Sequence, residues 1–247
     1  MKSGRISSYG LNGNALKIIA VISMLIDHIG VVLFPNVTIL RIIGRIAFPV
    51  FAFMIAEGCA YTKNKMRYFL TIFILGMAYQ GVYYIYTKEH YIGILIAFSV
   101  SILVIYALEY FKNTIFEADC SFLKQGLAFV ILLLIIIIVY ILNDNFESDY
   151  GFWGAMAPVF ASLFRKPLNS NSELYKKLDN NVMHVLMLSM PLVFVALIYG
   201  GTQPYSLFAI PHLLFYSGKR GKLKLKYFFY IFYPVHLVAL EAISFFS

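Results

Sequence analysis

The chain has 247 residues, of which 61% are hydrophobic and only 13% are charged, and its mean hydropathy is +0.78. Soluble globular domains are about half apolar and about a quarter charged. The composition therefore excludes an ordinary soluble domain. The continuous apolar runs predict an all-α, polytopic bundle of transmembrane helices rather than the alternating pattern of a β-barrel.

The charged residues and the cysteines narrow the class of partners. The formal net charge is +8, but Lys and Arg fall at the ends of the apolar segments, which is the pattern that sets orientation in a membrane. We therefore expect contacts with membrane lipids and none with nucleic acid. Cys59 and Cys120 lie far apart without a CxxC motif, so the sequence indicates neither a metal site nor a disulfide framework.

Nine apolar segments are candidates for membrane spans, with eight to ten as the expected range. The sixth and eighth are short for a hydrocarbon core about 30 Å thick, so we expect them to be tilted, half-inserted or extended at their ends. The loops are too short for a second domain, so residues 1–247 are predicted to form one domain. The segments cover approximately residues 15–35, 40–61, 68–86, 91–110, 126–142, 151–164, 182–199, 205–216 and 227–246.

Loop charges predict the orientation of these segments. Lys and Arg concentrate in alternate loops, whereas the opposite loops contain Asp144, Glu147 and Asp149. This asymmetry predicts a cytoplasmic N-terminus in a multi-pass protein of the cell membrane. The basic N-terminus ahead of an apolar run resembles a signal peptide. The long run carries ionisable residues and has no A-x-A site, which favours an uncleaved first helix.

The first segment carries two adjacent ionisable residues, Asp27 and His28. An Asp at the centre of a spanning helix costs on the order of 2.5–3.5 kcal/mol on insertion scales, so such a residue is a functional hypothesis by default. The structural alternative is that Asp27 only pairs with an Arg on the next helix. Because consecutive helical residues point about 100° apart, Asp27 and His28 cannot form a simple intrahelical pair.

The second segment supplies Arg41, Arg45 and Glu57. Arg45 is expected at about the depth of Asp27, where the two charges would neutralise each other. Arg41 lies one turn nearer the outer surface and could extend toward it. Glu57 lies near the cytoplasmic end, where it could face Lys17. Pro49 predicts a kink in this helix.

Lys17 and His28 are separated by ten residues, which brings them to nearly the same helix face, about three turns apart. The last segment carries Tyr233 and His236, and His236 is deep enough to face the same region as Lys17 and His28. The basic loop before this segment has two interpretations. It either sets orientation and contacts anionic lipids, or it attracts a phosphate-bearing donor from the cytoplasm.

Several blocks of sequence together resemble the TraX family, which is named for the protein that acetylates conjugative pilin. The blocks are G-x-x-L-K-x-I-A-x-x-x-M-x-x-D-H-x-G, R-I-x-G-R-I-A-F-P-x-F-A-F-x-x-x-E-G, Y-S-G-K-R-G and F-Y-I-F-Y-P-V-H-L, at residues 13–30, 41–58, 216–221 and 229–237. The resemblance extends to integral-membrane acyltransferases that carry an Arg, ten residues and a catalytic His on the first helix. Lys17 stands in the place of that Arg. Its ammonium is a point charge, whereas a guanidinium can form two parallel hydrogen bonds.

The resemblance implies acyl transfer from cytoplasmic acyl-CoA, with acetyl-CoA as the expected donor and no metal, to an acceptor at or across the membrane. The residues fit this chemistry. His28 is a base near neutrality or an acyl carrier, and Asp27 tunes the site. The residues expected to bind substrate or donor, or to stabilise an oxyanion, are Lys17, Arg41, Arg45, Glu57, Tyr233 and His236.

Two other function classes stay open at this point. A transporter or proton-coupled permease could use the same charges as a relay, although the sequence shows no internal repeat. A non-catalytic membrane assembly factor would tolerate replacement of His28 apart from effects on stability. The acceptor, whether peptide, glycan or small amine, is not specified, and neither are the acyl chain length and the oligomeric state.

Overall fold

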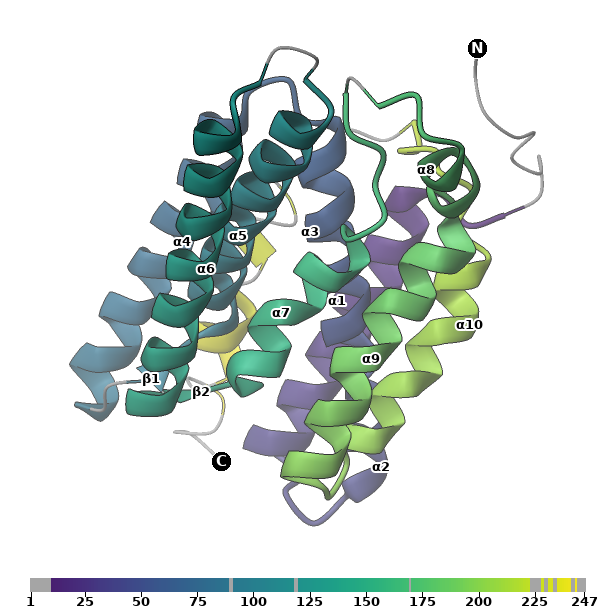
Figure 1. The fold of residues 1–247 in the computed structure, drawn as a ribbon. Helices are drawn as coiled ribbons and strands as arrows, with labels where there is room; N and C mark the ends of the chain where they lie inside the picture. Colours follow the sequence, from purple (N-terminus) through teal and green to yellow (C-terminus); the bar gives the residue numbers. More distant parts are fainter. Residues whose placement is uncertain are drawn as a thin grey trace. The chain divides into compact units, whose positions relative to one another are not determined.

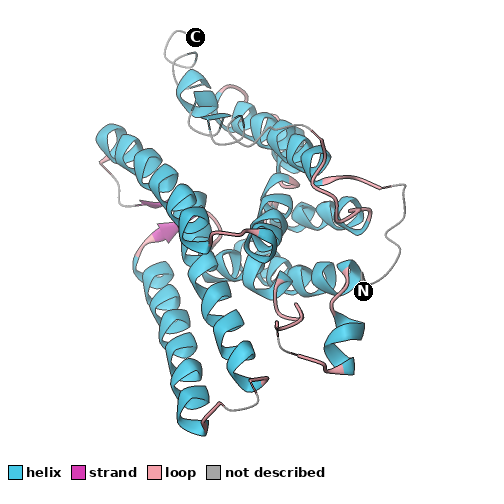
Figure 2. Cartoon of the chain, turned by 90° about the horizontal axis from the view of Figure 1, so that it is seen from above, coloured by secondary structure: helices cyan, strands magenta, loops and turns pink. Residues whose placement is uncertain are grey.

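The computed structural model describes residues 10–88, 91–117, 120–168 and 170–222, and residues 228, 231–232, 235–240 and 243 of the C-terminal segment. Helices make up most of the described chain, and two short strands pair with each other (Figure 2). The chain divides into two compact units, Met1–Met54 with Ala196–Ser247, and Ile55–Val195. The single domain expected for residues 1–247 remains a prediction.

The first unit begins with α1 (Gly13–Val32), followed by α2 (Thr38–Gly44) and the first half of α3 (Ala47–Tyr61) (Figure 1). Asn12 caps α1, because its side-chain oxygen accepts a hydrogen bond of 3.0 Å from the backbone N–H of Ala15. α2 packs against α1 and against the short 3₁₀ helix η1. The unit also contains the end of α9 (Asn181–Tyr199), η1 (Gln203–Phe208) and α10 (Ala209–Leu214).

The predicted kink at Pro49 is confirmed as a break between α2 and α3. The two helices are separated at Arg45 and Ile46, and Pro49 lies in the first turn of α3. A proline ring clashes with the carbonyl four residues earlier, which here belongs to Arg45. The break therefore comes where the proline prevents the helical ladder from continuing.

The second unit is organised around α5 (Ile94–Ile115), which packs against α4 (Lys65–Thr87), α6 (Phe122–Asn145) and α7 (Gly151–Ala161). The buried Ser101 hydroxyl of α5 donates a 2.5 Å hydrogen bond to the carbonyl of Ala155 in α7. The unit also contains α8 (Glu173–Leu178) and most of α9. Strands β1 (Tyr91–Ile92) and β2 (Glu147–Ser148) pair in parallel.

The predicted membrane helices are confirmed as helices over most of the described chain. Six of them are long and apolar enough to cross a membrane when α2 and α3 count together as Thr38–Tyr61. α7 has 11 residues and is the short sixth segment of the prediction. The eighth segment consists of η1 and α10, each six residues long. The exact number of spans and the orientation remain predictions.

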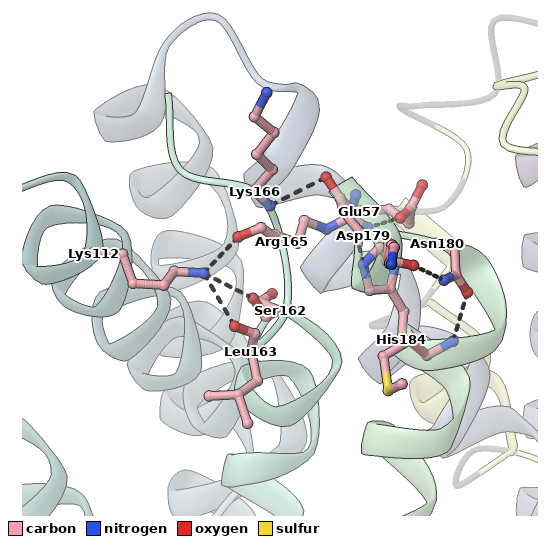
Figure 3. Close-up of polar contacts among 11 residues, drawn as sticks. Glu57, Lys112, Ser162, Leu163, Arg165, Lys166, Asp179, Asn180 and His184 are labelled. Atoms are coloured by element: carbon pink, nitrogen blue, oxygen red, sulfur yellow. Dashed lines mark hydrogen bonds and ion pairs between the residues drawn. The ribbon is translucent and has the colours of Figure 1, made fainter. Parts of the chain in front are cut away.

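A polar cluster in the second unit holds the segment that follows α7 (Figure 3). The ammonium of Lys112 donates to three backbone carbonyls, those of Ser162 at 3.3 Å, Leu163 at 3.2 Å and Arg165 at 2.8 Å. These carbonyls belong to residues that follow Ala161, the last residue of α7. Lys112 therefore holds the turn after α7 in place.

A second set of contacts in this cluster involves Asp179, which accepts a 3.1 Å hydrogen bond from the backbone N–H of Lys166 and lies 3.1 Å from the Nε2 of His184 (Figure 3). Burial alone would raise the pKa of the Asp179 carboxyl. The hydrogen bonds from His184 and Lys166 and the nearby charge of Arg165 outweigh it, so the pKa is lowered overall. The sequence indicated neither this contact nor the carbonyl contacts of Lys112.

Replacement of Lys112 by methionine should destabilise the protein. The substitution keeps an unbranched side chain but removes the ammonium that donates to three buried or partly buried carbonyls. The Ser162 carbonyl keeps the backbone N–H of Arg165 as a donor, so we expect a loss of about 2 kcal/mol in the free energy of unfolding. The measurement is thermal unfolding in detergent. Lys177→Met, an exposed lysine on α8, is the matched control, and equal unfolding temperatures for the two variants would contradict the role given to Lys112.

Candidate functional site

Asp27 and His28, neighbouring residues in the second half of α1, each belong to a different cluster of ionisable side chains. The two side chains face different parts of the first unit. Asp27 is buried, 8% exposed, and contacts α2 and the residue that follows it. His28 is partly exposed and contacts the C-terminal segment. The predicted divergence of these two side chains is therefore confirmed, and each has its own partners.

Asp27 is bound by two guanidinium groups at the same carboxylate oxygen, Oδ2. Arg41 approaches it with Nη1 at 2.8 Å, and Arg45 hydrogen-bonds to it through Nη2. The predicted pairing of Asp27 with Arg45 is confirmed. Arg41 was expected to extend toward the nearer membrane surface, but it contacts Asp27 because residues four apart on a helix share a face. One carboxylate and two guanidiniums give this cluster a formal charge of +1.

Gly44 explains how the arginine-bearing helix comes so close to Asp27. A Cβ atom at position 44 would lie 2.2 Å from the Cβ of Asp27 and 2.3 Å from its Oδ1. No side chain fits at that distance, so glycine is required for this approach. A small residue at this position therefore permits the close helix contact.

His28 and His236 form a direct hydrogen bond between residues 208 positions apart in the chain. The Nδ1 of His28 lies 2.9 Å from the Nε2 of His236, and the ring centroids are 4.9 Å apart. The other nitrogen of His236, Nδ1, lies 2.8 Å from the carbonyl oxygen of Phe232. His236 is 5% exposed, and its ring stacks on that of Phe232 with an interplanar angle of 8°. The expectation that His236 reaches the surroundings of His28 is confirmed.

The start of α1 is bound to the basic segment 215–221. The backbone N–H of Gly13 donates to the carbonyl of Lys219 at 2.7 Å, and that of Asn14 donates to the carbonyl of Arg220 at 3.1 Å. Gly221 has φ +90°, in the left-handed region that favours glycine. The backbone of this segment is therefore fixed beside the end of α1 that carries Lys17.

Lys17 and His28 both lie on the continuous helix α1, which confirms the shared helix that their spacing predicted. Eleven residues at about 1.5 Å each separate them by roughly 16 Å along the helix axis. Lys17 is partly buried in the first turns of α1. A cation at one end of α1 and an imidazole near the other are thus carried by one rigid element.

The remaining predicted site residues have different positions. Glu57 is buried in the second unit and pairs with Arg165 (Figure 3). The guanidinium of Arg165 also lies 5.7 Å from the ring centre of Tyr61. The sequence position of Arg165 carries no signal of this contact. Tyr233 lies outside the described residues.

Comparison with known proteins gives a family and two relatives. A family described as TraX protein matches residues 12–244. An uncharacterized protein of Rickettsia prowazekii (strain Madrid E) is 41% identical over 122 residues, covering 49% of this chain and 44% of that protein. A probable fimbrial assembly protein, FimC of serogroup H1, from Dichelobacter nodosus is 25% identical over 255 residues, covering 91% of this chain and 92% of the relative. No solved structure matches.

Replacement of Gly44 by alanine should disturb the ion cluster. The new methyl group displaces the Asp27 side chain, and overpacking of this kind costs about 1–3 kcal/mol, so we expect a lower temperature of thermal unfolding in detergent. Gly126→Ala is the matched control, because position 126 is also helical and has open space for a Cβ. An unfolding temperature unchanged by Gly44→Ala would show that the close approach to Asp27 is not required.

Proposed function

The chain belongs to the TraX family, and on that premise we propose that it is a membrane-bound acyltransferase. The proposed reaction moves an acyl group, most simply acetyl, from cytoplasmic acyl-CoA to an amine or hydroxyl acceptor at or across the membrane. Two findings support the proposal. The family is associated with pilin acetylation, and the six apolar helices fit an integral membrane protein.

The observation that carries the proposal is the position of His28. It is an imidazole inside an apolar helix, and it is held by a second buried imidazole rather than by a carboxylate. Acyl transfer to an amine or hydroxyl needs a base that works near neutral pH, and histidine is the usual choice. Asp27 is engaged by two arginines, so its charge acts on His28 from one residue away rather than through a bond.

In the direct route, the Nε2 of His28 removes the proton of the acceptor as its nitrogen or oxygen attacks the thioester carbonyl. The new C–N or C–O bond forms, the C–S bond breaks, and the imidazolium returns the proton to the CoA sulfur. In the covalent route, His28 itself attacks the thioester and the acceptor then displaces it. Both routes use the same residue and the same donor.

Cations near His28 supply the electrostatic part of the mechanism. Arg41 is the more exposed of the two arginines, with 30% of its side chain accessible against 5% for Arg45. We assign stabilisation of the developing oxyanion to Arg41 and the holding of Asp27 to Arg45. Lys17 and the basic segment 215–221 lie at the N-terminal end of α1, where they would meet the phosphates of the acyl-CoA donor.

The other predicted site residues receive narrower roles. Glu57 is neutralised by Arg165, which supports a structural role in the second unit. Tyr233 remains a predicted substrate contact. For the acceptor, the Dichelobacter relative is described as a fimbrial assembly protein, which supports testing pilin peptides together with glycans and small amines.

Replacement of His28 by alanine should abolish acyl transfer. General acid–base catalysis contributes on the order of 10²–10⁴-fold, so we expect a loss of that size in the transfer of radiolabelled acetyl groups by protein in lipid nanodiscs. Label retained on wild-type His28 would assign the covalent route.

The control for this experiment is His212→Ala, which removes a histidine that hydrogen-bonds only locally to Phe208 in the described contacts. This variant should keep wild-type activity. Undiminished transfer by the His28 variant, or a wild-type protein that neither binds nor consumes acetyl-CoA, would overturn the proposed function.

A further inference from the structure

We infer that His236 is a positioning residue that fixes the tautomer of His28, so that the unprotonated Nε2 of His28 is presented to the acceptor. The hydrogen bonds on both sides of the His236 ring carry this inference. Its catalytic consequence rests on the proposed function, but the tautomer itself does not.

The first step concerns the carbonyl of Phe232, four positions before His236. Its oxygen lies 2.8 Å from the Nδ1 of His236. A carbonyl oxygen only accepts hydrogen bonds, so the Nδ1 of His236 must carry a proton. The ring is held in this orientation by its stacking on Phe232, with centroids 4.9 Å apart.

The second step is the bond between the two rings. A neutral imidazole that carries its proton on Nδ1 has an unprotonated Nε2, which accepts. The Nε2 of His236 lies 2.9 Å from the Nδ1 of His28. The Nδ1 of His28 must therefore donate, and a neutral His28 is left with its lone pair on Nε2. The Phe232 carbonyl thus fixes the tautomer of His236, and His236 in turn fixes the tautomer of His28.

The third step is the fate of the transferred proton. When the Nε2 of His28 takes the proton of the acceptor, an N–H or O–H bond of the acceptor breaks and the Nε2–H bond of His28 forms. The resulting positive charge is shared with His236, whose Nε2 accepts the Nδ1–H of His28 and can take its proton. When CoA leaves, the proton on the Nε2 of His28 moves to its sulfur, and the pair returns to the starting arrangement. No other co-reactant is needed.

Burial makes this arrangement specific. His236 is 5% exposed, so its Nε2, which accepts the hydrogen bond from His28, is largely withheld from water. Outer hydrogen-bond partners of this kind fix the tautomer and orientation of functional histidines, and their loss commonly costs 10–100-fold in activity, roughly. Without His236, His28 is free to carry its proton on Nε2, where it cannot act as a base toward the acceptor.

The test compares His236→Phe and His236→Gln in the full chain in lipid nanodiscs. Phenylalanine keeps a flat ring on Phe232 but removes the acceptor, whereas the glutamine amide oxygen can still accept from His28. Imidazole ¹⁵N NMR of histidine-labelled protein, with signals assigned by His28→Asn, reports the tautomer directly. We expect His28 protonated on Nδ1 in the wild type and in His236→Gln, and protonated mainly on Nε2 in His236→Phe.

Activity gives the second readout. We expect kcat to fall by about 10–100-fold in His236→Phe, with KM for acetyl-CoA changed less than about twofold, and to recover at least partly in His236→Gln. His212→Phe is the matched control, because His212 also contacts the carbonyl of a phenylalanine four residues earlier, at 3.0 Å. It should change neither the tautomer of His28 nor kcat.

The NMR result separates this inference from the proposed function, since it requires no turnover. A wild-type His28 protonated on Nε2 and bare on Nδ1 would overturn the inference, even if His236→Phe fails to fold. An unchanged His28 tautomer in folded His236→Phe would overturn it as well. An Nδ1–H tautomer in a protein that does not use acetyl-CoA would leave the positioning role intact and remove the acyltransferase.

Discussion

The ion cluster of Asp27, Arg41 and Arg45 is the interaction on which the first unit depends. A charged carboxylate in a low-dielectric bundle is stable only when cations and hydrogen bonds replace the lost water. Asp27 obtains both from one short helix, because Arg41 and Arg45 converge on the same oxygen. Removing one partner of such a buried pair typically costs 3–5 kcal/mol, roughly, which is a large part of the stability of a domain.

Other features of this region follow from the need to bring two arginines to one carboxylate. Gly44 has no side chain where a Cβ would overlap Asp27, and the helix ends at Gly44, ahead of Pro49. The break separates α2, which carries the contacts to Asp27, from α3, which continues the predicted membrane span. Because consecutive residues of a helix point in different directions, His28 faces His236 and not the arginines.

Much of this fold could be predicted because long apolar runs in a membrane have few alternatives to helices. The pairing of Asp27 with Arg45 was also predictable, since depth and charge leave few partners within one hairpin. The partner of Glu57 was not. Arg165 is 108 residues away, and its burial depends on how α7 ends, which no local pattern reports. The His28–His236 bond was indicated only as a shared neighbourhood, because ring orientation depends on packing against Phe232.

The long separation of His28 and His236 bears on how the protein is made. Translation delivers Asp27 and its arginines within 18 positions of one another, so a charge that is costly inside a membrane is neutralised early. The partner of His28, His236, is synthesised 208 positions later. An imidazole can remain neutral during that interval, whereas a carboxylate cannot remain charged there without a partner. The order of synthesis therefore keeps the imidazole pair from assembling until the segment that carries His236 has emerged from the ribosome.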